Sequence, residues 1–146
     1  VQAGADVLYD KTADEVDISN EYTSVEEMEY MEEVDNEDNS GYEIIEMRDQ
    51  VSRSTNNINW TVGSKQIAVS SYFSLQKGDK IKLRIMLTPD DQVVKAGYQM
   101  YGASAVTVKG ANMISHTFTV SKTGKYRIYI KNPGMKKIRV IGSYSR

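Results

Sequence analysis

Residues 113–131, MISHTFTVSKTGKYRIYIK, alternate apolar and polar side chains on both sides of a turn at Lys122-Thr123-Gly124. Successive side chains of a β-strand point to opposite faces of the sheet, so a period of two places all the apolar groups on one face. The apolar positions are Ile114, Phe118, Val120, Tyr126, Ile128 and Ile130. The stretch therefore predicts two half-buried antiparallel strands.

The same alternation occupies most of the chain after residue 57, interrupted by short segments rich in Gly, Pro, Asn and Asp. It predicts strands over residues 58–62, 66–75, 80–88, 98–108, 113–121, 125–131 and 136–144. Seven such strands predict an all-β fold, an antiparallel β-sandwich of jelly-roll type. Besides the six residues above, the predicted core contains Ile58, Trp60, Val62, Ile67, Val69, Phe73, Leu75, Ile81, Leu83, Ile85, Leu87, Val106, Val108, Ile138, Val140 and Tyr144.

Charge divides the chain into two parts. Residues 1–50 contain 17 of the 20 acidic residues and only two basic ones, a net charge of −15, whereas residues 51–146 have a net charge of +13. We expect an acidic N-terminal arm over residues 1–50 and a basic β-sandwich domain over residues 51–146. A field between two parts of opposite sign favours docking of the arm on the domain.

The arm has too few apolar residues to form a core of its own, so it is expected to order only against another surface. Ser24 and Glu27 form a capping box at the start of a possible helix. The apolar residues that follow at helical spacing are Val25, Met28, Met31 and Val34. This pattern predicts a short helix near residues 25–34; without it the arm is disordered.

The next segment, residues 35–46, partly matches a calcium-binding loop. Asp35, Glu37, Asn39 and Glu46 supply oxygens at positions 1, 3, 5 and 12, as in an EF-hand, but the glycine stands at position 7 instead of position 6. Two interpretations remain, a weak calcium site formed by these four residues and a hydrated acidic loop. No other cofactor is expected.

Basic and aromatic side chains occupy the outward positions of the predicted strands. They form the candidate ligand-binding face: Tyr72, Lys80, Lys82, Arg84, Tyr101, Lys125, Arg127, Tyr129, Lys131, Lys137 and Arg139. Three interpretations of the cations remain: solvated residues that protect the sheet from aggregation, a dock for the arm's carboxylates, and a site for an external polyanion. Exposed tyrosines stack on sugars or pack against peptides.

Catalytic sites are not indicated. Residues 51–146 contain no Glu, and their three Asp residues, Asp79, Asp90 and Asp91, lie in turns where Asp bonds to the backbone. The single histidine, His116, lies in the alternation of a strand, where a structural role is usual. No phosphate-binding loop or nucleophile elbow is present. We therefore expect no enzyme activity, and no nucleic-acid partner, since the attached arm would compete with the phosphates.

The run from His116 to Asn132 resembles the closing hairpin of bacterial secreted jelly-roll domains of the pre-peptidase C-terminal type, in which a Thr-Gly turn precedes Tyr and alternating aliphatic residues. The resemblance implies an extracellular β-sandwich. Collagen-binding domains of that family likewise have an acidic segment, which binds calcium, before a Tyr-rich sandwich. The chain opens with Val-Gln-Ala-Gly-Ala and no Met, which suggests a removed leader. Both features predict a secreted or cell-surface location.

These features predict a noncatalytic, exported binding or surface-interaction module. Its expected ligands are cell-wall or host extracellular polymers or proteins, with the acidic arm docked on the basic face. The alternative is a structural accessory part of an envelope assembly, and a hydrolase ranks third. A membrane span is not expected, because the sequence has no run of about 18 apolar residues.

Overall fold

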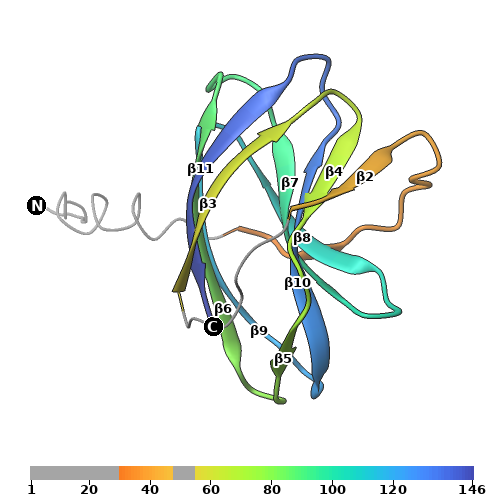
Figure 1. The fold of residues 1–146 in the computed structure, drawn as a ribbon, viewed down its shortest axis with the longest axis vertical. Helices are drawn as coiled ribbons and strands as arrows, with labels where there is room; N and C mark the ends of the chain where they lie inside the picture. The colour runs from red at the N-terminus through yellow and green to blue at the C-terminus, as the bar shows by residue number, and fades with distance from the viewer. Residues whose placement is uncertain (1–29, 48–54) are drawn as a thin grey trace, which may run out of the picture.

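The computed structural model describes residues 30–47 and 55–146, which form two β-sheets packed face to face (Figure 1). The larger sheet has the strand order β1-β8-β7-β10-β4-β2, with β5 also paired to β10, and the smaller sheet has the order β3-β11-β6-β9. The all-β sandwich is confirmed. The strands are β1 Glu33–Val34, β2 Glu43–Glu46, β3 Thr55–Val62, β4 Gln66–Val69, β5 Phe73–Leu75, β6 Lys80–Thr88, β7 Val94–Met100, β8 Ala105–Gly110, β9 Met113–Thr119, β10 Gly124–Asn132 and β11 Ile138–Ser145.

The main core fills the space between the sheets and follows from the alternation of the strands. Strand β6 alternates strictly between exposed and buried residues along its length. Phe73 of the larger sheet stacks on Tyr144 of the smaller one, with ring centroids 5.8 Å apart. Most of the predicted core residues lie in this cluster. Each such large side chain stabilises the fold by about 1.5–3 kcal/mol. No helix of the described residues has the length and apolar character needed to cross a membrane.

Two of the predicted strands are each divided in the structure. The strand predicted over residues 66–75 breaks after Val69, where Ser70 Oγ accepts a hydrogen bond from the backbone N–H of Ile128 (2.9 Å) before the chain resumes as β5. The strand predicted over residues 98–108 is two strands, β7 and β8, joined by a turn in which Gly102 has a φ of +80°. Glycine adopts this left-handed conformation readily, so Gly102 already indicated a turn at this point of the sequence.

The last two predicted strands do not pair with each other. Strand β10 belongs to the larger sheet and β11 to the smaller one, so the chain crosses between sheets after Asn132. The buried Asn132 side chain holds this crossover, donating hydrogen bonds to the carbonyl oxygens of Val62 and Gly63 (both 3.0 Å) and accepting one from the N–H of Gly134 (3.1 Å). The candidate basic residues therefore divide between the two outer faces of the sandwich.

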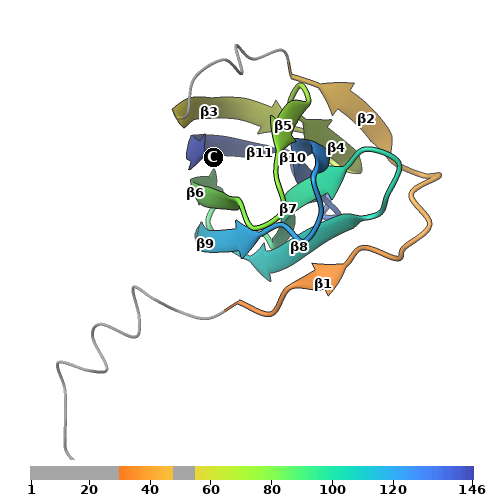
Figure 2. The ribbon, with the colours of Figure 1, turned by 90° about the horizontal axis from the view of Figure 1, so that it is seen from below.

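Residues 30–47, which we call the strap, belong to the larger sheet. Strand β1 extends one edge by pairing with β8, and β2 extends the other edge by pairing in parallel with β4. Figure 2 shows the strap, in orange, running along the outside of this sheet between its two edges. The helix predicted near residues 25–34 is wrong over residues 30–34, which pair as a strand at Glu33–Val34; residues 25–29 lie outside the described residues. The predicted boundary at residue 50 also lies outside them.

Candidate functional site

Three lysines lie side by side on the outer face of the larger sheet. The strand register places Lys109 of β8 opposite Lys95 of β7, and Lys95 opposite Lys131 of β10. Like charges at opposed positions destabilise a sheet, so this row needs counter-charge. The strap supplies it: Lys95 Nζ lies 3.1 Å from Glu37 Oε2 and 3.7 Å from Asp35 Oδ1. The expected docking of acidic N-terminal residues on basic ones is thus found on this sheet.

Lys131 lies at the centre of the contact between strap and sheet, with its side chain 0% exposed. Its Nζ donates to Glu37 Oε1 (2.7 Å), Asn39 Oδ1 (2.6 Å) and both carboxylate oxygens of Asp35 (3.1 and 3.3 Å), and lies 4.5 Å from the centre of the Tyr42 ring. The four oxygens accept all the hydrogen bonds that one ammonium group can donate, with both Asp35 oxygens sharing a donor. The Tyr42 ring adds a cation–π contact.

This arrangement changes the interpretation of the calcium-like loop. Asp35, Glu37 and Asn39, the residues at positions 1, 3 and 5, do converge on one cation, but the cation is the ammonium group of Lys131. Glu46, the expected fourth ligand, lies at the end of β2 and is exposed. Among residues 30–47 and 55–146, no group of three acidic, His or Cys side chains is placed to hold a metal ion.

The carboxylates around Lys131 are held in their charged form. Burial of Asp35 favours its neutral form, but hydrogen bonds from Tyr129 and Lys131 outweigh burial and lower its pKa below the ordinary 3.8. Hydrogen bonds from Lys131 and Lys95 lower the pKa of Glu37. Burial also disfavours the ammonium form of Lys131, but Glu37 and Asp35 outweigh it and raise the pKa of Lys131. Asp35, Glu37 and Lys131 are therefore charged near neutral pH.

Apolar packing beneath the strap forms a second, smaller core. Ile67 and Val69 of β4 point to this side, together with Ala105, Tyr129 and the half-buried Tyr42. Assigning Ile67 and Val69 to the main core was wrong, because it assumed that the outer face of the larger sheet is open to water. The strap covers that face, and the hydroxyl of Tyr129 donates to Asp35 Oδ2 (2.6 Å).

Two residues of the candidate ligand-binding face are therefore covered. Tyr129 is 3% exposed and Lys131 is 0% exposed, and both are bonded to Asp35. Their outward register was predicted correctly, but contact with an external ligand would require removal of the strap. Lys95 and Tyr42 were missed as members of this cluster, because only the strand pairing shows that they lie beside Lys131.

Four of the candidate residues remain accessible beside the strap, at the β5 end of the larger sheet. The rings of Tyr72 and Tyr101 meet edge to face, 5.4 Å apart, and the Arg127 guanidinium lies 4.7 Å from the centre of the Tyr72 ring. Gln99 fixes Arg127 by accepting a hydrogen bond from its Nε (3.0 Å). Tyr101 lies in the β7–β8 turn and is 71% exposed, and its N–H donates to the carbonyl of Lys125 (2.8 Å). We call Tyr72, Tyr101, Lys125 and Arg127 the tyrosine surface.

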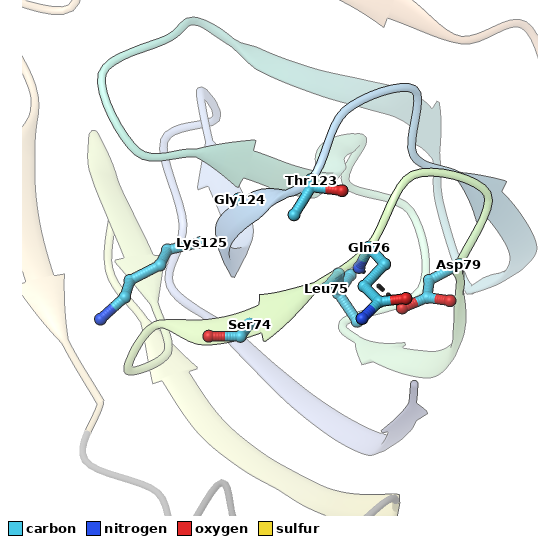
Figure 3. Close-up of a pocket in the computed structure, with 7 residues that line it drawn as sticks. All are labelled: Ser74, Leu75, Gln76, Asp79, Thr123, Gly124 and Lys125. Carbon is cyan, nitrogen blue, oxygen red and sulfur yellow. Dashed lines mark hydrogen bonds between the residues drawn. The ribbon is translucent and has the colours of Figure 1, made fainter.

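A pocket of about 520 Å³ adjoins the tyrosine surface through Lys125 (Figure 3). Strand β5 and the residues after it form one wall, and the start of β10 forms the other. Asp79 stands with Gln76 at one end, where its Oδ2 accepts a hydrogen bond from the N–H of Gln76 (2.8 Å), while the Lys125 side chain extends away at the other end. The lining residues are Ser74, Leu75, Gln76, Asp79, Thr123, Gly124 and Lys125.

The other candidate cations lie on the opposite side of the molecule. Lys80, Lys82 and Arg84 alternate along β6, and Arg139 lies on the neighbouring strand β11, all exposed on the smaller sheet. Lys137 lies in the loop just before β11 and lines a shallow pocket with Thr61 and Arg139. No carboxylate of the described residues forms an ion pair with these cations.

His116 has a structural environment. Its Nε2 lies 2.7 Å from Glu32 Oε2, and its ring meets those of Tyr30 and Phe118 edge to face at 5.8 and 4.7 Å. The Tyr30 hydroxyl donates to the carbonyl of Met113 (3.1 Å). These contacts join the first residues of the strap to β9.

Comparison with known proteins identifies the fold. No protein-family model matches the chain, and no curated protein matches it either. The structure is similar to that of Aeromonas hydrophila PliG, a periplasmic lysozyme inhibitor of g-type lysozyme, with a TM-score of 0.51 and 10% identity over 70% of this chain and 96% of that one. A mutant of PliG-Ec, a periplasmic inhibitor of g-type lysozyme from Escherichia coli, aligns with a TM-score of 0.43 and 10% identity over 71% of this chain and 97% of that one. The likeness to the A. hydrophila protein is one of fold.

Proposed function

We propose that this chain is a noncatalytic, protein-binding module of the bacterial envelope or cell surface, and that the tyrosine surface is the centre of its contact with the partner. The observation that carries the proposal is the group formed by the exposed Tyr101 and the half-buried Tyr72 and Arg127, whose side chains are held in place by their neighbours. Tyrosine and arginine are the residue types enriched at energetic centres of protein interfaces.

The geometry of the tyrosine surface supports this role. Tyr101 is the most exposed of the three, yet its backbone is bonded to β10 and its ring packs on Tyr72. Arg127 is fixed between Gln99 and the Tyr72 ring. A partner would therefore pay little side-chain entropy to order these groups, which favours tight binding. The adjoining pocket can accept a projecting side chain of the partner.

One further point supports a location in the envelope, and another supports binding over catalysis. The sandwich is similar in fold to PliG, a periplasmic inhibitor of g-type lysozyme, so this fold is compatible with protein binding in the envelope. The pocket beside the tyrosine surface contains one carboxylate, Asp79, which already accepts a backbone hydrogen bond. A pair of carboxylates is needed for ordinary glycoside hydrolysis, so this pocket favours binding over cleavage.

Replacement of Tyr101 by Ala tests the proposal. The full-length chain should bind at least one protein of a panel consisting of purified g-type lysozyme and fibrillar collagen, and Tyr101→Ala should weaken that binding about 30-fold, as for an interface centre worth about 2 kcal/mol. Biolayer interferometry measures both affinities. Met135→Ala, which removes another exposed apolar side chain (86% exposed), is the matched control and should bind like the wild type.

Two results would count against the proposal. Binding to neither protein at near-millimolar concentration would contradict it for these partners and favour the structural role in an envelope assembly. Binding to isolated peptidoglycan in place of both proteins would reassign the tyrosine surface to a wall polymer, provided that Tyr101→Ala abolishes it.

A further inference from the structure

Among the described residues, the outer face of the smaller sheet contains no carboxylate. Its outward positions, read from the burial and register of the four strands, combine basic side chains with neutral hydroxyl and amide groups. They are Thr55, Asn57, Asn59 and Thr61 of β3; Arg139, Ile141, Ser143 and Ser145 of β11; Lys80, Lys82, Arg84, Met86 and Thr88 of β6; and Met113, Ser115, Thr117 and Thr119 of β9. We call this set the smaller-sheet face.

An apolar row crosses the centre of this face. Ile141 of β11 stands opposite Met86 of β6, and Met86 stands opposite Met113 of β9. Ile141 is 50% exposed and Met86 is 58% exposed, although both lie in the two central strands of the sheet. Exposed apolar groups that adjoin one another and are rimmed by polar ones are typical of interaction sites.

Cations flank the apolar row on both sides. Arg84 lies two residues from Met86 along β6, and Arg139 lies two residues from Ile141 along β11 in the opposite direction across the row. The polar contacts of this face are with neutral groups: Arg139 Nε donates to Asn59 Oδ1 (2.8 Å) and Lys80 Nζ to Thr119 Oγ1 (3.1 Å). Within the described residues, no carboxylate compensates the charge of the cations on this face.

From this pattern we infer a second docking surface, distinct from the tyrosine surface, whose occupant is an acidic segment of another protein. The occupant presents apolar side chains to Ile141, Met86 and Met113, and carboxylates to Arg84 and Arg139. Charge complementarity requires an acidic occupant, because the described outward residues of this face include four cations and no anion. This inference does not depend on the proposed function, which concerns the opposite sheet.

Other occupants fit the same face less well. A second copy of this chain would oppose its cations to their own counterparts in a two-fold dimer, which is unfavourable. A polyphosphate or sulfated glycan would satisfy the cations and leave the apolar row exposed. The strap carboxylates Asp35 and Glu37 are bound to Lys95 and Lys131 on the other sheet.

A labelled peptide of alternating glutamate and leucine tests the inference with the full-length chain. Fluorescence anisotropy at low salt should show saturable binding, and Arg84→Glu should weaken it at least about tenfold, since like-charge contact costs several kcal/mol in an interface. Lys109→Glu makes the same charge change on the larger sheet and should leave the affinity within about twofold of the wild type.

The remaining measurements separate the possible occupants. Met86→Asp should also weaken binding, whereas Tyr101→Ala should leave the affinity for the peptide unchanged. Failure of this inference is therefore distinguishable from failure of the proposed function. Equal affinity for polyglutamate or heparin would overturn the inference in favour of a simple polyanion site. Equal weakening by Arg84→Glu and Lys109→Glu, or no binding by the full-length chain, would also overturn it.

Discussion

Replacement of Lys131 by Met is expected to lower the free energy of unfolding by about 3 kcal/mol. Methionine fills nearly the same volume but removes the ammonium group. The buried Asp35 carboxylate then keeps the Tyr129 hydroxyl, a long hydrogen bond from the N–H of Glu37 (3.4 Å) and the more distant Lys95 as partners. Breaking a buried ion pair on one side costs about 3–5 kcal/mol because the remaining charge is uncompensated. Urea unfolding followed by tryptophan fluorescence measures the change.

Two variants make this result interpretable. Lys109→Met removes an exposed lysine from the same row of the sheet and should change stability by less than about 0.5 kcal/mol. The double variant Lys131→Met with Asp35→Asn should be more stable than Lys131→Met alone, because the orphaned charge is gone. If Lys131→Met and Lys109→Met had equal effects, the buried cluster would not hold the strap.

The substitution Gly142→Ala is expected to destabilise the fold by a similar amount, about 3 kcal/mol. Gly142 lies in β11, between β3 and β6, and a Cβ atom there would stand 2.0 Å from the carbonyl oxygen of Arg84 and 2.7 Å from the Cα of Ile85. Both are backbone atoms of the neighbouring strand, so the sheet itself must move, and overpacking of this kind costs about 1–3 kcal/mol or more.

Gly41→Ala is the matched control for this prediction. A Cβ atom at Gly41 meets nothing within 4 Å, so the substitution should change the urea midpoint little. A Gly142→Ala variant as stable as Gly41→Ala would mean that β11 and β6 are farther apart than described.

The sandwich was predictable because its strands obey a period of two over long runs. Strands β3 and β6 alternate along their whole length, and nearly all their inward residues reach the main core. The division of residues 98–108 into two strands was missed although Gly102 marked the turn. The separation of β10 from β11 depends on the contacts of the Asn132 side chain, which no periodicity reveals.

The candidate site was predictable only in part, for a physical reason. The spacing of Asp35, Glu37 and Asn39 indicated a cation, and the structure places the ammonium group of Lys131 against these side chains. Calcium and an ammonium group both take oxygen partners, so the spacing alone does not distinguish them. The identity of the cation depends on Lys131, which is 96 residues from Asp35 in the sequence. Distant pairing also covers Tyr129 and Lys131 while leaving Tyr72 and Tyr101 accessible.

The division of charge along the chain acquires a structural meaning from these contacts. Part of the acidic half is built into the larger sheet, where it neutralises Lys95 and Lys131 above a small apolar core. The cations of the smaller sheet have no such partner among the described residues. Within the described residues, one face therefore has internal charge pairing, and the other has cations for which we propose an acidic partner.

Amide hydrogen exchange of the strap at low salt and in 1 M NaCl tests most directly whether the strap is a built-in part of the sandwich. The amides of Asp35 and Met47 donate to the carbonyls of Ala105 (2.8 Å) and Val69 (2.7 Å), at the two edges of the larger sheet. At 1 M salt the Debye length is about 3 Å, which screens exposed charges but hardly affects buried ones. We expect both amides to remain protected to the same degree. Exchange at the rate of an unstructured peptide in 1 M salt would contradict the account, because it would mean an arm held only by surface charge.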